Sequence, residues 1–272
     1  MKSLHCINRT FAHGTSSNDK TEPKFTWIHN HLPDDLSLPV VVVDSLLPSV
    51  MNMGETYNLY AWLSESSAII SHTKEFLQGN VETVMQNYKK VFTCDHTLLD
   101  LHDRIEFCPN GSNLPWVSCE PKDKTNLVSI ISSGKNTTEG HKLRNKCVEY
   151  CLSNPGFDVY GRAYKPIETK DEALVPYMFS IVYENACYDK YYTEKITDCF
   201  ASKTIPIYWG TKLIGEDFNT DGIIFVDDLP KVMLSSELYY SKIKAVEENY
   251  ERVKSLSSAD DLLFEKITGE KP

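Results

Sequence analysis

The order of apolar and polar positions along the chain predicts strands that alternate with helices. Residues 38–44 form a continuous apolar run that ends in an acid. Such a run is typical of a strand buried on both faces, as in a parallel sheet covered by helices on either side. Shorter runs at 68–71, 90–93 and 104–108 predict further strands, and residues 74–86 have the character of a helix. This alternation indicates an α/β fold.

A second series of the same kind follows a segment that resembles a linker. Residues 115–124 contain two prolines and four charges. Beyond them the pattern predicts strands at 126–132, 157–160, 178–183, 205–208 and 223–226, helices at 141–152 and 193–201, and helices at the end of the chain. We therefore expect two three-layer, Rossmann-like α/β domains, residues 1–120 and 121–272, with a cleft between them. Ligands of such sheets bind outside the carboxyl ends of the strands.

Charge and composition narrow the function. The chain has 28 basic and 38 acidic residues, a formal net charge of −10, which argues against a generic nucleic-acid binder. It leaves room for a small basic site that binds a nucleotide diphosphate. No signal peptide or run of 18 apolar residues is present, so we expect no membrane anchor and a cytoplasmic location. The eight cysteines contain no CxxC pair and are expected to be reduced, and no metal site is predicted.

The first candidate site is the segment 183–195, which lies between a predicted buried strand and an amphipathic helix. Thr193 is a plausible N-cap, so free backbone N–H groups and the positive end of the helix dipole would face an anion here. Lys195 in the first turn would add a positive charge, and Glu194 could accept two hydroxyl groups, as a ribose offers. The alternative interpretation is a solvated Glu–Lys pair at the start of a helix.

The second candidate, residues 133–144, also follows a strand and opens a helix. It lacks the spacing and the Gly-Lys-Ser/Thr of a P-loop, so a P-loop NTPase is rejected. The segment would deliver Arg144 to the same edge of the sheet, where a planar guanidinium can grip a diphosphate. The alternative is an ordinary solvated base on a helix surface.

These residues carry a resemblance to a known family. Residues 179–210, with Glu-Asn after the strand, Tyr-x-Thr-Glu-Lys and Ile-Pro-Ile-Tyr-Trp-Gly, are similar to the donor-binding motif of glycosyltransferase family 10, the inverting α1,3/α1,4-fucosyltransferases. Residues 127–133 and 140–145 resemble the same family. The resemblance is good over 127–228 and faint over 1–120, where only 60–66 and 91–95 are similar.

The resemblance implies a GT-B fold with an acceptor-binding domain at 1–120 and a nucleotide-sugar domain at 121–272. Arg144 and Lys195 would hold the donor diphosphate, Glu194 would bind the ribose hydroxyls, and Asn185 and Tyr191 would line the donor site. The donor would be GDP-fucose and the acceptor a glycan. We expect no tightly bound cofactor and no required divalent metal, because cations would stabilise the leaving diphosphate and the chain contains no Asp-x-Asp triplet.

The general base of such a transfer would be a carboxylate of the amino-terminal domain that faces the acceptor hydroxyl. Glu65 is favoured, with Asp95 and Asp44 next. Because the amino-terminal half diverges from the family, two alternatives remain. One is a UDP-sugar donor such as UDP-xylose, and the other is an inactive glycan-binding homologue. The lack of the membrane anchor found in the animal enzymes suggests a soluble microbial or viral member.

Overall fold

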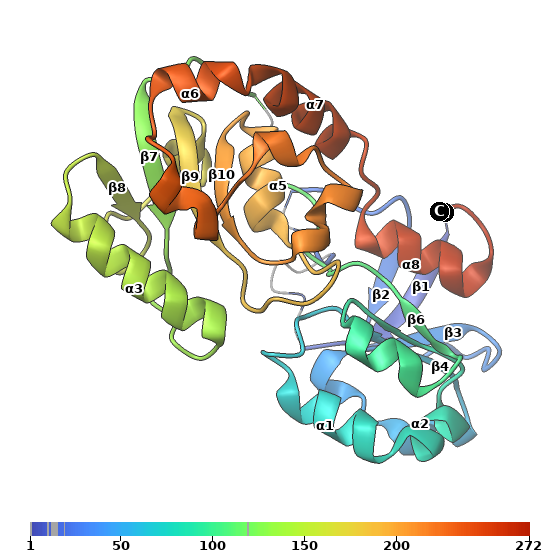
Figure 1. Ribbon diagram of the computed structural model, residues 1–272. Coiled ribbons are helices and arrows are strands. Elements are labelled where there is room, and N and C mark those ends of the chain that lie inside the picture. The colour runs from blue at the N-terminus through green and yellow to red at the C-terminus, as the bar shows by residue number, and fades with distance from the viewer. Residues whose placement is uncertain (1, 10, 12–15, 19, 119) are drawn as a thin grey trace. The chain divides into compact units, whose positions relative to one another are not determined.

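The structure is a computed structural model that describes residues 2–272 except 10, 12–15, 19 and 119, and it divides into two compact units (Figure 1). The first unit comprises residues up to Asn113 together with Ser257–Pro272, and the second is Leu114–Leu256. The expected domains, 1–120 and 121–272, differ from these units mainly at the end of the chain. Helix α8 (Ala259–Thr268) belongs to the first unit because it buries Ala259, Leu263 and Phe264 against that unit's sheet.

The described residues of the first unit form a six-stranded sheet in which every pairing is parallel. Its strand order is β2-β1-β3-β4-β5-β6. The strands are β1 (Ser3–Ile7), β2 (Thr26–His29), β3 (Pro39–Val43), β4 (Asn58–Leu63), β5 (Val91–Thr93) and β6 (Ile105–Phe107). The connecting helices are α1 (Ser71–Gly79) and α2 (Val81–Asn87), with 3-10 helices η1 (Asp44–Leu46), η2 (Met51–Glu55) and η3 (His96–Leu101).

Strand β3 shows why its sequence is apolar without interruption. Val40 and Val42 pack on one face of the sheet with residues of α1 and α2, whereas Val41 and Val43 pack on the other face with Trp27 and residues of α8. Successive side chains of a strand point to opposite faces, so a strand covered on both sides must be apolar at every position.

Part of the sequence prediction for this unit is wrong. The runs at 38–44, 90–93 and 104–108 form β3, β5 and β6 as predicted, but residues 68–70 form a turn in which Ile69 is 43% exposed. The strand between β3 and β5 in the sheet is β4, and none of β1, β2 and β4 was predicted. The predicted helix at 74–86 is two helices that meet at Asn80. A short apolar run has no periodicity that separates a strand from a packed turn.

The second unit contains, within its described residues, a five-stranded parallel sheet of order β11-β10-β9-β7-β8. All five predicted strands are present. They are β7 (Asn126–Ile131), β8 (Phe157–Tyr160), β9 (Tyr177–Tyr183), β10 (Ile205–Trp209) and β11 (Ile224–Phe225). The helices are α3 (Glu139–Ser153), α4 (Asp171–Leu174), α5 (Glu194–Ala201), α6 (Ser236–Ser241), α7 (Ile243–Lys254), η4 (Lys212–Glu216), η5 (Thr220–Gly222) and η6 (Val226–Lys231).

Helices cover both faces of this sheet. Residues of α5, among them Ile196 and Phe200, pack on one face with Val182 and Tyr208. Residues of α3 and α6 pack on the other face with alternate positions of the same strands, including Ile181. The unit is therefore a three-layer α/β structure, and the loops that enter α3 and α5 both leave the carboxyl edge of its sheet (Figure 1).

Candidate active site

Two helix N-termini meet at the carboxyl end of β9. Thr138 caps α3 with a capping box, in which its Oγ1 accepts the His141 N–H at 3.2 Å and the His141 ring accepts the Thr138 N–H. The N–H of Gly140 donates to the carbonyl of Asn185, just after β9. A Cβ at Gly140 would lie 1.7 Å from the carbonyl oxygen of Glu184, so only glycine allows α3 to begin this close to the strand.

Arg144 lies one turn inside α3 and is buried, with 6% of its surface exposed. Its Nη2 is 3.4 Å from the Ser133 hydroxyl, and its buried Nε has no hydrogen-bond partner. Among the described residues, no carboxylate lies within the 4.0 Å of an ion pair with this guanidinium. Burial lowers the pKa of Arg144, although Tyr164, Glu184 and Glu194 act in the opposite direction. A buried cation without a counter-charge is costly unless a ligand supplies one.

Lys195 lies in the first turn of α5, as predicted, beside the N-cap. Its Nζ is 2.8 Å from Oγ1 of Thr193 and 3.4 Å from Oε2 of Glu184. Glu184 is fully buried at the end of β9, where it accepts both the N–H and the hydroxyl of Thr193. Burial raises the pKa of Glu184, and the nearby Lys195 ammonium partly offsets this. Glu184 thus fixes the loop that presents Lys195.

Glu194 is the first residue of α5 and is 8% exposed. Its Oε1 lies 3.2 Å from Nζ of Lys170 and 3.7 Å from Nζ of Lys195. Burial opposes its ionisation, but these two ammonium groups outweigh that effect and lower the pKa of Glu194 to about 2. The side chain is therefore a carboxylate at neutral pH, able to accept hydrogen bonds from hydroxyl groups.

The remaining predicted donor-site residues lie in the loop between β9 and α5. Asn185 is half-buried next to the N-terminus of α3, while Tyr191 is fully buried with its ring packed edge-on against Tyr188. The structure thus brings Arg144, Asn185, Glu194 and Lys195 to one edge of one sheet, and it places Tyr191 in the wall of the same loop.

The three acidic candidates lie in the first unit. Glu65 follows β4 and is half-buried, and its Oε1 accepts the N–H of Ser66. Asp44, which follows β3 at φ +51°, accepts the Glu65 N–H and the Ser64 hydroxyl. Asp95 is fully buried, caps η3 and forms an ion pair with Lys74 at 2.8 Å. Asp95 is thus occupied by a helix cap and an ion pair, Asp44 supports the Glu65 loop, and Glu65 is the most accessible of the three.

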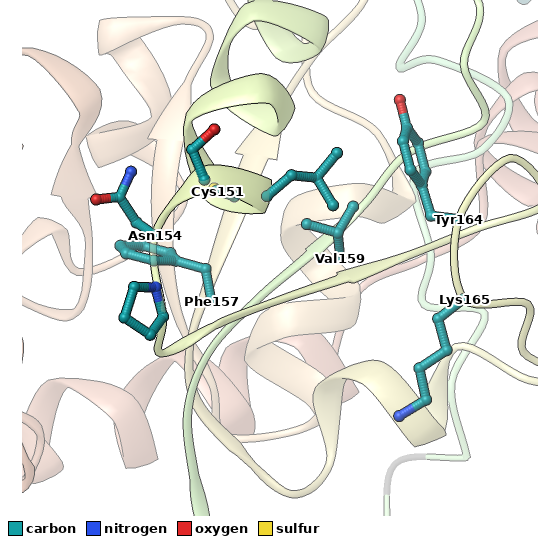
Figure 2. Close-up of a pocket in the computed structure, with 9 residues that line it drawn as sticks. Cys151, Asn154, Phe157, Val159, Tyr164 and Lys165 are labelled. Carbon is teal, nitrogen blue, oxygen red and sulfur yellow. The ribbon is translucent and has the colours of Figure 1, made fainter.

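A separate pocket of about 610 Å³ opens at the other end of α3. Figure 2 shows Cys151, Phe157, Val159, Tyr164 and Lys165 around it. None of the predicted site residues lines this pocket, and its walls come from the last turn of α3, from β8 and from the loop after β8. The pocket is thus distinct from the cluster around Arg144.

Sequence reasoning missed two members of the cluster, Lys170 and Asp198. Asp198 sits one turn after Glu194 on α5, and Lys170 precedes α4. The i, i+4 spacing of the two acids was a usable signal for a shared partner. Nothing in the segment around Lys170 indicates that its side chain reaches α5.

Comparison with known proteins agrees with this fold. Two parallel α/β units define a GT-B fold, and two solved structures share it over nearly the whole chain. A structure described as α1,3-fucosyltransferase with GDP has a TM-score of 0.56 at 15% identity and covers 95% of this chain and 92% of its own. Another α1,3-fucosyltransferase structure has a TM-score of 0.57 at 18% identity, with 98% and 89% covered.

Residues 121–254 match the family described as glycosyltransferase family 10 (fucosyltransferase), C-terminal region. Through these residues the chain matches glycosyltransferase family 10, which confirms the resemblance. The α-(1,3)-fucosyltransferase FucT of Helicobacter pylori is 42% identical over 130 residues, 40% of this chain. The matched segment is 26% of that relative's length.

Two further findings concern the described residues alone. No helix among them has both the length and the apolar character that a membrane crossing requires. Likewise, no group of three or more His, Cys, Asp or Glu side chains in the described ranges is arranged to hold a metal ion.

Proposed function

We propose that this protein is an inverting fucosyltransferase that transfers fucose from GDP-fucose to a hydroxyl group of a glycan. The observation that carries the proposal is the buried guanidinium of Arg144, which has no ion pair among the described residues and an Nε without a hydrogen-bond partner, and which therefore favours an anionic ligand. The family match makes a nucleotide-sugar diphosphate the appropriate anion. A related fold has been solved with GDP-fucose, at 16% identity and a TM-score of 0.51, which supports the choice of nucleotide and sugar.

The charges of the cluster match this ligand. Glu184, Glu194 and Asp198 already form ion pairs with Lys195 and Lys170 before a ligand arrives. Arg144 is the cation of this cluster that has no ion pair among the described residues, and a diphosphate between Arg144 and Lys195 would be held by charge-assisted hydrogen bonds and by the N-terminus of α5. The carboxylate of Glu194 would then accept the ribose hydroxyls, while Asn185 and Tyr191 shape the loop around the donor.

We infer that donor binding and transfer need no divalent metal. Arg144, Lys195 and the helix N-termini would stabilise the charge that develops on the leaving GDP. The described cysteines are free thiols, and we expect the protein to act in a reducing compartment such as the cytoplasm. The base would be Glu65, which the hydrogen bonds from Ser66 and to Asp44 hold at the carboxyl edge of the first sheet.

The first prediction tests the donor site with Arg144→Met, which keeps the apolar packing of the side chain and removes its charge. Loss of a charged hydrogen bond weakens binding by about 1.5–3 kcal/mol, so GDP affinity should fall about 10- to 150-fold. The thermal stability of the ligand-free protein should stay equal or rise, because an unpaired buried charge has been removed. Calorimetric titration with GDP and a melting curve measure the two effects.

The matched control is Arg252→Met, which removes an exposed arginine from the same unit. It should leave GDP affinity unchanged. All titrations are run in EDTA and repeated with Mn²⁺. Unaltered GDP binding in Arg144→Met would refute the proposed phosphate site. Tighter binding of UDP than of GDP would refute GDP-fucose as the donor. Binding that requires Mn²⁺ would refute metal independence.

A further inference from the structure

Lys170 occupies a position that the proposed reaction does not yet explain. It directly precedes α4, and its side chain reaches α5, where Nζ lies 2.6 Å from Oδ2 of Asp198 and 3.2 Å from Oε1 of Glu194. The two acids are four residues apart on α5, so one ammonium group bridges adjacent turns of the helix. The Lys170 side chain is 24% exposed, in contrast to the solvated lysines of the surface.

Groups other than Glu194 fix the place of this ammonium. Asp198 is buried, and its second oxygen accepts the backbone N–H groups of Trp116 and Val117 at 2.5 and 3.2 Å. The Lys170 ammonium also lies 4.5 Å from the centre of the Trp116 ring, within the range of a cation–π contact. Lys170 is thus anchored by Asp198 and Trp116, and Glu194 is the partner that it orients.

The second lysine near Glu194 has a different task. Lys195 is 3.7 Å from Oε1 of Glu194 and also contacts Thr193 and Glu184. In the proposed complex Lys195 turns toward the diphosphate, which removes one of the two cations that face Glu194. Lys170 remains, because none of its anchors belongs to the phosphate site. It keeps the Glu194 carboxylate ionised and in one orientation while the nucleotide binds.

We propose that Lys170 is a positioning residue for ribose recognition, which acts by holding the carboxylate of Glu194 toward the 2′- and 3′-hydroxyl groups of the nucleotide. The inference rests on the proposed function, since it takes Glu194 as the ribose acceptor. It adds Lys170, which is remote in the sequence, to the residues of ribose recognition, with Asp198 and Trp116 as the groups that hold Lys170 in place. The buried ion-pair network then holds the Glu194 carboxylate in its binding orientation before the ribose arrives. Ligand binding therefore costs less side-chain entropy.

The test compares GDP with 2′,3′-dideoxy-GDP, which lacks both hydroxyl groups. Wild-type protein should bind GDP more tightly by about 10-fold or more, the effect of hydrogen bonds to a charged acceptor. Glu194→Gln sets the reference for a weakened acceptor. Lys170→Met should lower the GDP preference toward that of Glu194→Gln, while its affinity for the dideoxy nucleotide changes little. A merely structural role would weaken both nucleotides together and leave their ratio intact.

Two further variants secure the result. Lys170→Met/Asp198→Asn removes the acid left uncompensated in the single variant, and it should regain thermal stability without regaining the GDP preference. Lys203→Met, at the other end of α5 and paired with Glu247, should keep the wild-type ratio. A wild-type ratio in Lys170→Met or in the double variant would overturn the inference. A wild-type protein that binds GDP and dideoxy-GDP equally would instead refute Glu194 as the ribose acceptor.

Discussion

At the scale of single residues, the surroundings of His141 keep its ring uncharged. Its ring is buried at the start of α3, and burial, followed by the positive charges of Arg144, Lys195 and Lys135, lowers its pKa to about 4. The ring is therefore neutral at pH 7 and serves as the acceptor half of the capping box, while the proposed phosphate-binding charge rests on Arg144 and Lys195.

This gives a prediction for stability against pH. The unfolded chain protonates His141 near its ordinary pKa of 6.5, whereas the native state protonates it only near 4. The unfolded state binds more protons in this window, so His141 reduces the free energy of unfolding as pH falls from 6.5 to 4. His141→Gln keeps a capping residue at N3 and does not titrate.

Denaturant titrations at pH 7 and pH 4.5 measure the difference. The wild type should lose on the order of 2 kcal/mol more than His141→Gln between the two conditions, from 1.36 kcal/mol per pKa unit. A parallel pH dependence of the two proteins would show that His141 ionises equally in both states.

The site residues differ in how far the sequence reveals them. Arg144, Glu194 and Lys195 could be predicted because each lies in the first turns of a helix that directly follows a buried strand, a local pattern. Lys170 meets its partners 24 and 28 residues further along the chain. No local spacing encodes that contact, since it depends on where α4 and α5 lie in the folded unit.

At the scale of elements, the close approach of α3 to β9 determines the geometry of the proposed donor site. Gly140→Ala would place a methyl group against the Glu184 carbonyl, and α3 would have to move away from the strand. We expect a loss of about 1–3 kcal/mol in unfolding free energy, as for other overpacked sites. GDP affinity should fall as well, because Arg144 moves with the helix.

The matched variant is Gly79→Ala, at the end of α1, where an added methyl group meets no atom within 4 Å. Its stability should be unchanged or higher by up to about 1 kcal/mol. Chemical denaturation and GDP calorimetry on both variants provide the comparison. Native stability and affinity in Gly140→Ala would mean that α3 can shift without disturbing the site.

Element prediction succeeded where tertiary context agreed with the local pattern. The second unit's strands were all predicted, because each is a compact apolar run between polar loops. In the first unit, β4 carries Asn58 and half-buried Tyr60 among its apolar residues, and residues 68–70 carry exposed Ile69. Which of the two segments forms a strand is decided by burial on the folded sheet. Composition alone favours residues 68–70, which form a turn.

At the scale of the whole molecule, the proposed reaction separates two properties. Nucleotide affinity should depend on the second unit, which contains the whole Arg144 cluster, whereas turnover should also depend on Glu65 in the first. Glu65→Gln keeps the shape of the side chain and removes its basicity. Loss of a general base lowers the rate by about 10²- to 10⁴-fold, so kcat should fall by this factor with GDP affinity nearly intact.

Fucose transfer from GDP-fucose to a panel of glycans, alongside GDP calorimetry, checks this expectation. Glu75→Gln on the surface of α1 is the control and should keep native turnover. A Glu65→Gln protein with native turnover would pass the role of base to another carboxylate, with Asp44 and Asp95 the next variants to measure.

The return of the chain end to the first unit also has a consequence for synthesis on the ribosome. The first sheet lacks the cover of α8 until Ser257–Pro272 has been made, and the whole of Leu114–Leu256 emerges before that. At about 5–20 residues per second, this is a delay on the order of ten seconds. The second unit can therefore fold while the nascent chain is still tethered, whereas the first completes its core only after Ser257–Pro272 has been synthesised, when Asn113 can bond to Ser257 and Ala259.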